Sequence, residues 1–266
     1  MTPPSSSTEG FAGAIFDVDG VLVDSPHERA WRESLRRLME GDWRALAPRT
    51  RYTPEVFTHD FYQEVMAGKP RMAGARAALE RLGVPHPGPR TREYATEKQR
   101  RVVELISAGE FHAFPDALAF LLATKHAGLR IACASSSRNT RAMLERIRLD
   151  KFAVECGLRL PEVREGLTLL DAFDADVTGR DFPRGKPDPM IFLAAAEDLR
   201  LPPERCVVIE DALSGVQAAK AGGMAAIGVA RQGGAEVLWE AGADLVVGGL
   251  DEVDVDALTE GRLGRR

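Results

Sequence analysis

The amino-acid sequence predicts an α/β fold: a doubly wound parallel sheet of the Rossmann-like kind with an inserted all-helical domain. Short apolar runs without polar alternation recur along the chain, which is typical of strands covered on both faces of a parallel sheet. Segments with helical periodicity separate these runs, and this alternation favours a sheet with helices on both faces. One long block, residues 26–107, contains helical patterns and no convincing strand.

The expected strands are the apolar runs Gly13–Phe16, Leu129–Ala134, Cys206–Ile209, Met224–Val229 and Asp244–Val247. Among the helices, Asp116–Lys125 has apolar residues three and four positions apart, as a helix with one buried face requires. Another helix is expected over Ser214–Ala221, with Ser214 as its N-cap. These elements build the core domain from residues 11–25 and 108–266.

Residues 26–107 form the inserted domain in this prediction. Apolar stripes at helical spacing run through it, and prolines separate them. The stripes are Trp31, Leu35, Leu38, Met39; Phe57, Phe61, Val65; Met72, Ala75, Leu79, Leu82; and Val102, Leu105, Ile106. We expect them to form a core of their own. Residues 1–10 are expected to be a disordered tail, and Leu158–Phe173 a surface insertion, since it is longer than a usual connection.

Composition limits the partners of the protein. The chain has 266 residues, 44% of them hydrophobic, and a net charge of −5, so neither nucleic acid nor an anionic membrane is an expected partner. No apolar stretch approaches the ~20 residues of a membrane span. The spacing of Cys133, Cys156 and Cys206 matches no metal site and favours reduced thiols. We expect a cytoplasmic monomer or weak homo-oligomer.

Two acidic pairs follow predicted strands. Asp17 and Asp19 come directly after the first strand, and Glu210 and Asp211 directly after the third. Ligands bind at the carboxyl ends of strands in open α/β sheets, and carboxylates crowded there favour a hard cation such as Mg²⁺. An EF-hand is excluded, because its glycine is the sixth loop residue and Gly20 is the fourth. The second pair has an alternative explanation, since acidic residues also stabilise a helix N-terminus.

A serine and a lysine occupy comparable places later in the chain. Ser135 follows a predicted strand and precedes a helix expected near Asn139, so it suits a phosphate oxygen and, equally well, a helix cap. Lys186 precedes another helix, where its charge suits an anion, although a single lysine is by default a surface residue. The loop is not a Walker A motif, because Pro187 stands where Ser or Thr is required. Taken together and in order, the four signals indicate one phosphate and metal site.

These segments resemble the four motifs of the haloacid dehalogenase superfamily. The motifs are Asp17-Val18-Asp19-Gly20-Val21, then Ser135, then Lys186, then Glu210-Asp211. The resemblance spans nearly the whole chain, and the inserted helices are similar to the small helical cap of this superfamily. Within it, the segments around Gly20–Ser25, Ser135–Asn139 and Glu210–Gly222 resemble the β-phosphoglucomutase-like group most.

The resemblance implies a role for each motif residue. Asp17 would be the nucleophile that attacks phosphorus, and Asp19 the general acid and base. The phosphate would bind to Ser135, Ser136, Asn139 and Lys186. The Mg²⁺ cofactor would bind to Asp17, the main-chain carbonyl of Asp19, Glu210 and Asp211. A carboxylate attacks an anionic phosphate only if cations screen the charge, which Mg²⁺ and Lys186 would do.

Cap residues bear on the substrate. By the same resemblance, Gly68 and Arg71 belong to the loop that holds the distal phosphate of a sugar bisphosphate, and His27 is a hinge histidine. The implied function is a Mg²⁺-dependent phosphotransferase acting on phosphosugars through an aspartyl phosphate. The alternative is a phosphatase that hydrolyses small phosphate monoesters, such as sugar phosphates, on the same machinery. A third class, a receiver-like phospho-acceptor without catalysis, is disfavoured because a receiver has no helical cap.

Overall fold

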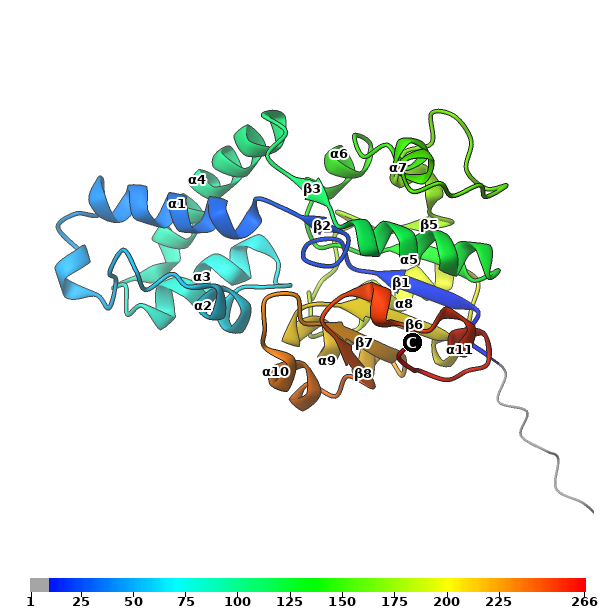
Figure 1. Cartoon of the computed structure of the whole chain (residues 1–266). Coiled ribbons are helices and arrows are strands. Elements are labelled where there is room, and N and C mark those ends of the chain that lie inside the picture. The colour runs from blue at the N-terminus through cyan, green and yellow to red at the C-terminus, as the bar shows by residue number, and fades with distance from the viewer. Residues whose placement is uncertain (1–9) are drawn as a thin grey trace, which may run out of the picture.

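The structure is a computed structural model that describes residues 10–266 (Figure 1), so the predicted disordered tail lies outside the described residues apart from Gly10. In the described chain, six parallel strands form one sheet in the order β5-β4-β1-β6-β7-β8. They are β1 (Gly13–Phe16), β4 (Arg130–Cys133), β5 (Ala175–Asp176), β6 (Cys206–Glu210), β7 (Ala225–Val229) and β8 (Leu245–Val247). The predicted fold class is confirmed.

Strand β1 lies inside the sheet, between β4 and β6. Gly13 is in register with Arg130 on one side and with Cys206 on the other. Every residue of β1 and β6 is buried, which explains why their sequences are apolar without alternation. The five predicted strands are all present. The sequence missed β5, because two residues, Ala175–Asp176, make no apolar run.

Helices cover both faces of the sheet. One face carries α5 (Pro115–His126), α6 (Thr140–Leu144), α7 (Leu149–Glu155) and α11 (Val255–Thr259). The other face carries α8 (Met190–Asp198), α9 (Leu213–Ala221) and α10 (Ala235–Glu240). A hydrophobic core lies on each face of the sheet, and alternate residues of β1 pack into them, with Phe16 on the first face and Ile15 on the second. Short 3-10 helices lie at Ala47–Arg49, Leu170–Ala172, Pro203–Arg205 and Leu250–Glu252.

The inserted helices group at one end of the sheet, on the left in Figure 1. They are α1 (His27–Glu40), α2 (His59–Val65), α3 (Arg71–Arg81) and α4 (Pro87–Ser107). Most of their buried residues form a separate core, as the sequence predicts. The stripe Val102, Leu105 and Ile106 of α4 is an exception, because it packs into the core of the sheet domain. A short antiparallel ribbon of β2 (Val23–Asp24) and β3 (His112–Ala113) carries the chain into and out of this cap. The exact limits of the two domains stay a prediction.

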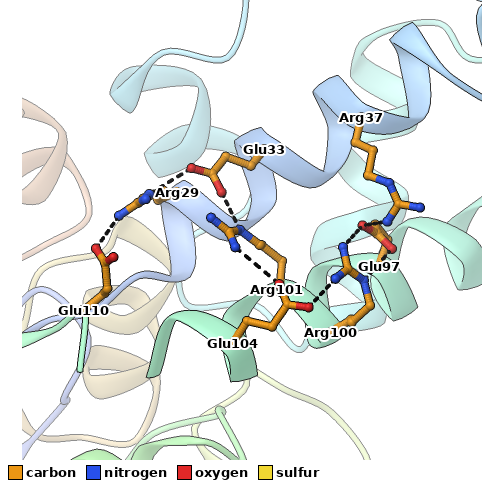
Figure 2. A network of polar contacts seen from close by, with 8 residues as sticks. All are labelled: Arg29, Glu33, Arg37, Glu97, Arg100, Arg101, Glu104 and Glu110. Carbon is orange, nitrogen blue, oxygen red and sulfur yellow. Dashed lines mark hydrogen bonds and ion pairs between the residues drawn. The ribbon is translucent and has the colours of Figure 1, made fainter. Parts of the chain in front are cut away.

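Ion pairs join the first and last helices of the cap (Figure 2). Glu33 of α1 accepts from Arg29 at 2.8 Å and from Arg101 of α4 at 2.6 Å. Arg29 also pairs with Glu110 at 2.7 Å, in the segment that leads back to the core. Single exposed ion pairs contribute about 0–1 kcal/mol, so the network reinforces a packing that the apolar stripes create.

Three further details differ from the sequence-based expectations. Ser214 is not an N-cap, because α9 begins at Leu213 and the Ser214 hydroxyl donates to the Ala67 carbonyl at 3.0 Å. Met72 is 46% exposed instead of lying in the cap core. The predicted surface insertion is partly packed, since Leu167 and Leu169 are buried in the core. No helix within residues 10–266 combines the length and apolar character that a membrane span needs.

Candidate active site

Three carboxylates meet at the carboxyl ends of two neighbouring strands. Asp17 follows β1, Glu210 ends β6 and Asp211 comes next, and the two strands pair in parallel register. One side-chain oxygen of each residue therefore lies within 4.8 Å of the other two. Hard oxygen donors grouped in this way suit Mg²⁺ better than zinc.

Lys186 is the counter-charge of this cluster. Its ammonium is buried and donates to Asp17 Oδ1 at 2.6 Å and to Glu210 Oε1 at 2.5 Å. The second oxygen of Glu210 accepts the Ala212 N–H at 2.8 Å. Both oxygens of Glu210 are thus engaged by the protein, whereas Asp17 and Asp211 line the cavity. Glu210 is placed to position Lys186.

Burial and like charges raise the pKa values of the carboxyl groups. Burial raises the pKa of Asp17 to about 7; Lys186 opposes this shift, and Glu210 and Asp19 add to it. Burial, followed by the charges of Glu210 and Asp17, raises the pKa of Asp211. Burial alone would lower the pKa of Lys186, but Asp17 and Glu210 outweigh it and raise that pKa. Negative charge is therefore in excess at this point, and a bound cation would relieve it.

Asp19 lies on the turn that leads from β1 to the cap. Its Oδ2 is 3.6 Å from His27 Nε2, which shares a hydrogen bond of 2.7 Å with Ser137 Oγ. Its Oδ1 is buried without a hydrogen-bond partner among the described residues. Burial lowers the pKa of His27 to about 4, with Asp19 opposing and Lys98 adding to the shift, so His27 is neutral at pH 7. The Asp19 Oδ1 is therefore available to a ligand.

The segment after β4 carries the predicted phosphate-binding residues. Ser135 is buried, and its Oγ accepts the Ser137 N–H at 3.1 Å and the Thr140 hydroxyl at 3.0 Å. Ser136 and Asn139 are half-buried and line the same cavity as Asp17 and Lys186. The structure therefore brings the predicted core residues to one place.

A cavity of about 700 Å³ lies between the core and the cap. The predicted cap residues His27, Gly68 and Arg71 all line it. Gly68 has a φ of 71°, and a Cβ there would lie 2.5 Å from Ser214 Oγ, so this cap loop lies directly against the start of α9. His27 and Gly68 are close to the core, whereas Arg71 is exposed at the edge of the cavity.

Sequence reasoning missed Lys98 of α4. This lysine lines the cavity, is only 5% exposed and lies 5.0 Å from the centre of the Trp31 ring. The signal was present in the sequence, because Lys98 falls four residues after Tyr94 and four before Val102, which are both buried. A charged residue on the apolar stripe of a helix points to a specific role.

The fold and the site define an enzyme with a Rossmann-like core, a polar centre at the edge of its sheet and a helical cap. Residues 11–223 match the family profile described as haloacid dehalogenase-like hydrolase. The chain belongs to this family.

Similar proteins are found among the β-phosphoglucomutase-like members. The β-phosphoglucomutase of Mycobacterium bovis is 33% identical over 264 residues, covering 92% of each chain. The "phosphorylated carbohydrates phosphatase" of Thermotoga maritima is 31% identical over 236 residues, covering 88% of this chain and 92% of that protein. The chloroplastic protein SUPPRESSOR OF QUENCHING 1 of Arabidopsis thaliana is 31% identical over 94% of this chain, which spans only 21% of that protein.

The solved structure of an archaeal β-phosphoglucomutase from Pyrococcus sp. strain ST 04 has the same fold. Its TM-score is 0.66 at 32% identity, and the match covers 92% of this chain and 96% of that one.

Proposed function

We propose that the protein is a Mg²⁺-dependent phosphotransferase that acts on phosphosugars through an aspartyl phosphate on Asp17. The observation that carries this proposal is the contact of Lys186 with Asp17 inside a cluster of three carboxylates. A nucleophilic carboxylate needs a fixed cation beside it, because it must approach an anionic phosphate. The names of the relatives, a mutase and a carbohydrate phosphatase, point to the same substrate class.

The reaction has two halves that use the same residues. In the first, an oxygen of Asp17 forms a bond to phosphorus, the ester P–O bond breaks, and Asp19 gives its proton to the leaving oxygen. In the second, Asp19 takes the proton from an attacking hydroxyl, whose oxygen forms a new P–O bond while the bond to Asp17 breaks. A sugar hydroxyl as the attacking group makes the enzyme a mutase, and water makes it a phosphatase.

The residues present fit a Mg²⁺ ion. Asp17 and Asp211 line the cavity with carboxylate oxygens, the main-chain carbonyl of Asp19 follows on the same turn, and negative charge is in excess there. Glu210 is a metal ligand in the sequence-based prediction, but both of its oxygens are engaged by Lys186 and the Ala212 N–H, so we assign it the role of holding Lys186 beside the ion. When bound, the ion supplies charge stabilisation for the phosphoryl oxygens. Ser135, Ser136 and Lys186 would hold the remaining phosphoryl oxygens, whereas Asn139, which contacts Gln99 beside Arg71, would serve a second anionic group.

Arg71 and Arg138 favour a substrate with a second anionic group. Arg138 pairs with Asp181, but no carboxylate contacts Arg71 among residues 10–266. Partial burial at the edge of the cavity and the charge of Arg138 lower the pKa of Arg71. The uncompensated positive charge at this end of the cavity suits the distal phosphate of a sugar bisphosphate.

Hydrolysis of phosphate monoesters is the second candidate function. It requires only that water replace the sugar hydroxyl as the attacking group. A phosphosugar substrate fits the cytoplasmic location expected from the sequence.

Asp17→Asn tests the proposal. The amide cannot form the acyl phosphate, so we expect turnover to fall more than about a thousandfold while the fold is retained. Phosphate release and hexose phosphate isomerisation are measured with Mg²⁺ and β-glucose 1-phosphate. Glucose 6-phosphate without free phosphate identifies a mutase, and phosphate release a phosphatase. Asp42→Asn is the control, because Asp42 is exposed and away from the cavity. Near wild-type turnover by Asp17→Asn would rule out the proposed nucleophile.

A further inference from the structure

Gln99 of α4 links the cap to the phosphate-binding segment of the core. Its Nε2 donates to Asn139 Oδ1 at 2.9 Å. Its Oε1 accepts from Arg71 Nη1, at the start of α3. One half-buried side chain thus connects a cap arginine and a core asparagine across the cavity, and all three residues line that cavity.

The chemistry of Arg71 fixes the direction of these hydrogen bonds. A guanidinium only donates, so the group of Gln99 that faces Arg71 must be the carbonyl oxygen. The amide nitrogen of Gln99 then faces Asn139, which turns the Asn139 carbonyl oxygen toward it. The Asn139 Nδ2 lies 3.4 Å from Gln99 Oε1, a distance at which a hydrogen bond is weak. This nitrogen is therefore left to donate to a ligand.

The donors on both sides of Gln99 thus suit an anion. Arg71 keeps its other N–H groups, and Asn139 keeps its Nδ2. Arg138, next to Asn139 in the chain, adds positive charge from the core side. A phosphate that reached this end of the cavity would meet donors from the cap and the core together, and Gln99 would keep them in register.

We propose that Gln99 is a positioning residue that determines specificity: it orients Arg71 and Asn139 for a second anionic group on the substrate. This inference rests on the proposed function, because it assumes that the first phosphate binds at Asp17. Gln99 itself acts through its two neighbours and does not take part in phosphoryl transfer.

Gln99→Glu tests the inference with almost no change in shape. A carboxylate only accepts, so it neutralises Arg71 and draws in the Asn139 Nδ2 that the phosphate needs. For a hexose 1,6-bisphosphate, we expect KM to rise and kcat/KM to fall at least about tenfold. For p-nitrophenyl phosphate, which has no second anion, kcat/KM should stay within about threefold, because the residues around Asp17 are unchanged. A merely structural role of Gln99 would lower kcat/KM for both substrates alike. The ratio of the two losses therefore distinguishes a positioning role from a structural one.

Gln63→Glu is the matched control. Gln63 lines the same cavity from α2, so this variant adds the same charge without touching Arg71 or Asn139. It should leave the ratio of the two substrates unchanged. Equal losses on both substrates in Gln99→Glu, no loss on either, or the same selective loss in Gln63→Glu would each overturn the inference. A failure of the proposed function is distinguishable, because the wild-type enzyme would then turn over neither substrate.

A double-mutant cycle keeps the inference testable if Gln99→Glu unfolds. Gln99→Met removes the hydrogen bonds without adding charge, and Asn139→Ala removes the donor that Gln99 orients. If Gln99 acts through Asn139, the double variant loses less bisphosphate kcat/KM than the product of the single losses. Independent, multiplying losses would contradict the inference.

Discussion

The side chain of Lys98 is buried, and burying its positive charge costs folding free energy. Burial lowers the pKa of this lysine to about 7; Asp19 opposes the shift, and Arg71 adds to it. The folded protein therefore holds fewer protons on Lys98 than the unfolded chain does between about pH 7 and the ordinary lysine value of 10.5. The destabilisation is full below pH 7 and decreases as the pH rises toward 10.5. Lys98 is therefore buried at a cost in stability.

Lys98→Met should therefore stabilise the protein in a pH-dependent way. Methionine fills a similar volume next to Trp31 without a charge. We expect the melting temperature to rise by at least about 2–4 °C at pH 6, the shift that corresponds to about 1 kcal/mol in a domain of this size. At pH 10 the rise should be smaller. Thermal melts of wild type, Lys98→Met and the exposed-site control Lys151→Met measure this difference. A gain that is equal or larger at pH 10 contradicts the buried cation.

The turn after β1 is the element that holds the proposed catalytic residues in register. Gly20 has a φ of 83°, in the region that favours glycine, and a Cβ there would lie 1.9 Å from Asp211 Oδ2. The turn is closed by a hydrogen bond of 2.9 Å from the Gly20 N–H to the Val23 carbonyl. Asp19 and Asp211 therefore keep their relative positions only while residue 20 has no side chain.

Gly20→Ala should lose both activity and stability. The methyl group must displace Asp211 or the turn, so we expect kcat to fall at least about tenfold and the free energy of unfolding to fall by more than about 1 kcal/mol. Gly83→Ala is the matched control: its φ is 69°, and no atom lies within 4 Å of the added Cβ. That variant therefore has the backbone strain of a positive φ without a steric clash. If the two variants behave alike in kinetics and chemical denaturation, close packing against Asp211 has no role.

Elements and core motif positions could be predicted because their signals are local in the chain. Asp17 and Glu210 stand at the ends of apolar runs, and parallel strands bring such ends to one edge of the sheet. The two-residue β5 had no such signal. The place of Ser214 at the start of a helix predicts a cap, but its hydroxyl donates to the carbonyl of Ala67, 147 residues away in the chain.

The part of the site that forms where the cap meets the core could not be predicted in the same way. Lys98 and Gln99 reach the cavity because α4 turns one face toward the core. The sequence pattern does not reveal how the cap is positioned relative to the core. Met72 continues an apolar stripe, yet α3 begins beside the cavity and leaves this side chain exposed. Roles that arise from the meeting of two domains depend on their relative position, which spacing along the chain does not encode.

Binding of Mg²⁺ at this meeting of distant segments, as proposed above, would make the stability of the whole molecule depend on the ion. Asp17 and Asp211 come from strands almost two hundred residues apart in the chain, and their oxygens cluster only in the folded state. A divalent ion that binds this cluster therefore stabilises the fold without binding the unfolded chain to the same degree. At about 100 times its dissociation constant, Mg²⁺ should raise the melting temperature by about 5–10 °C. NaCl at equal ionic strength should have little effect.

Asp211→Asn separates ion binding from general screening. Burial and the neighbouring carboxylates raise the pKa of Asp211, so its charge is unfavourable when no cation is bound, and the amide removes it. We expect this variant to melt higher than wild type in EDTA and to gain almost nothing from MgCl₂. The two melting curves should thus change order as Mg²⁺ is added to both proteins. If Asp211→Asn keeps the full Mg²⁺-dependent shift, or wild type shows none, the acidic cluster does not bind the ion and the proposed mechanism loses its cofactor.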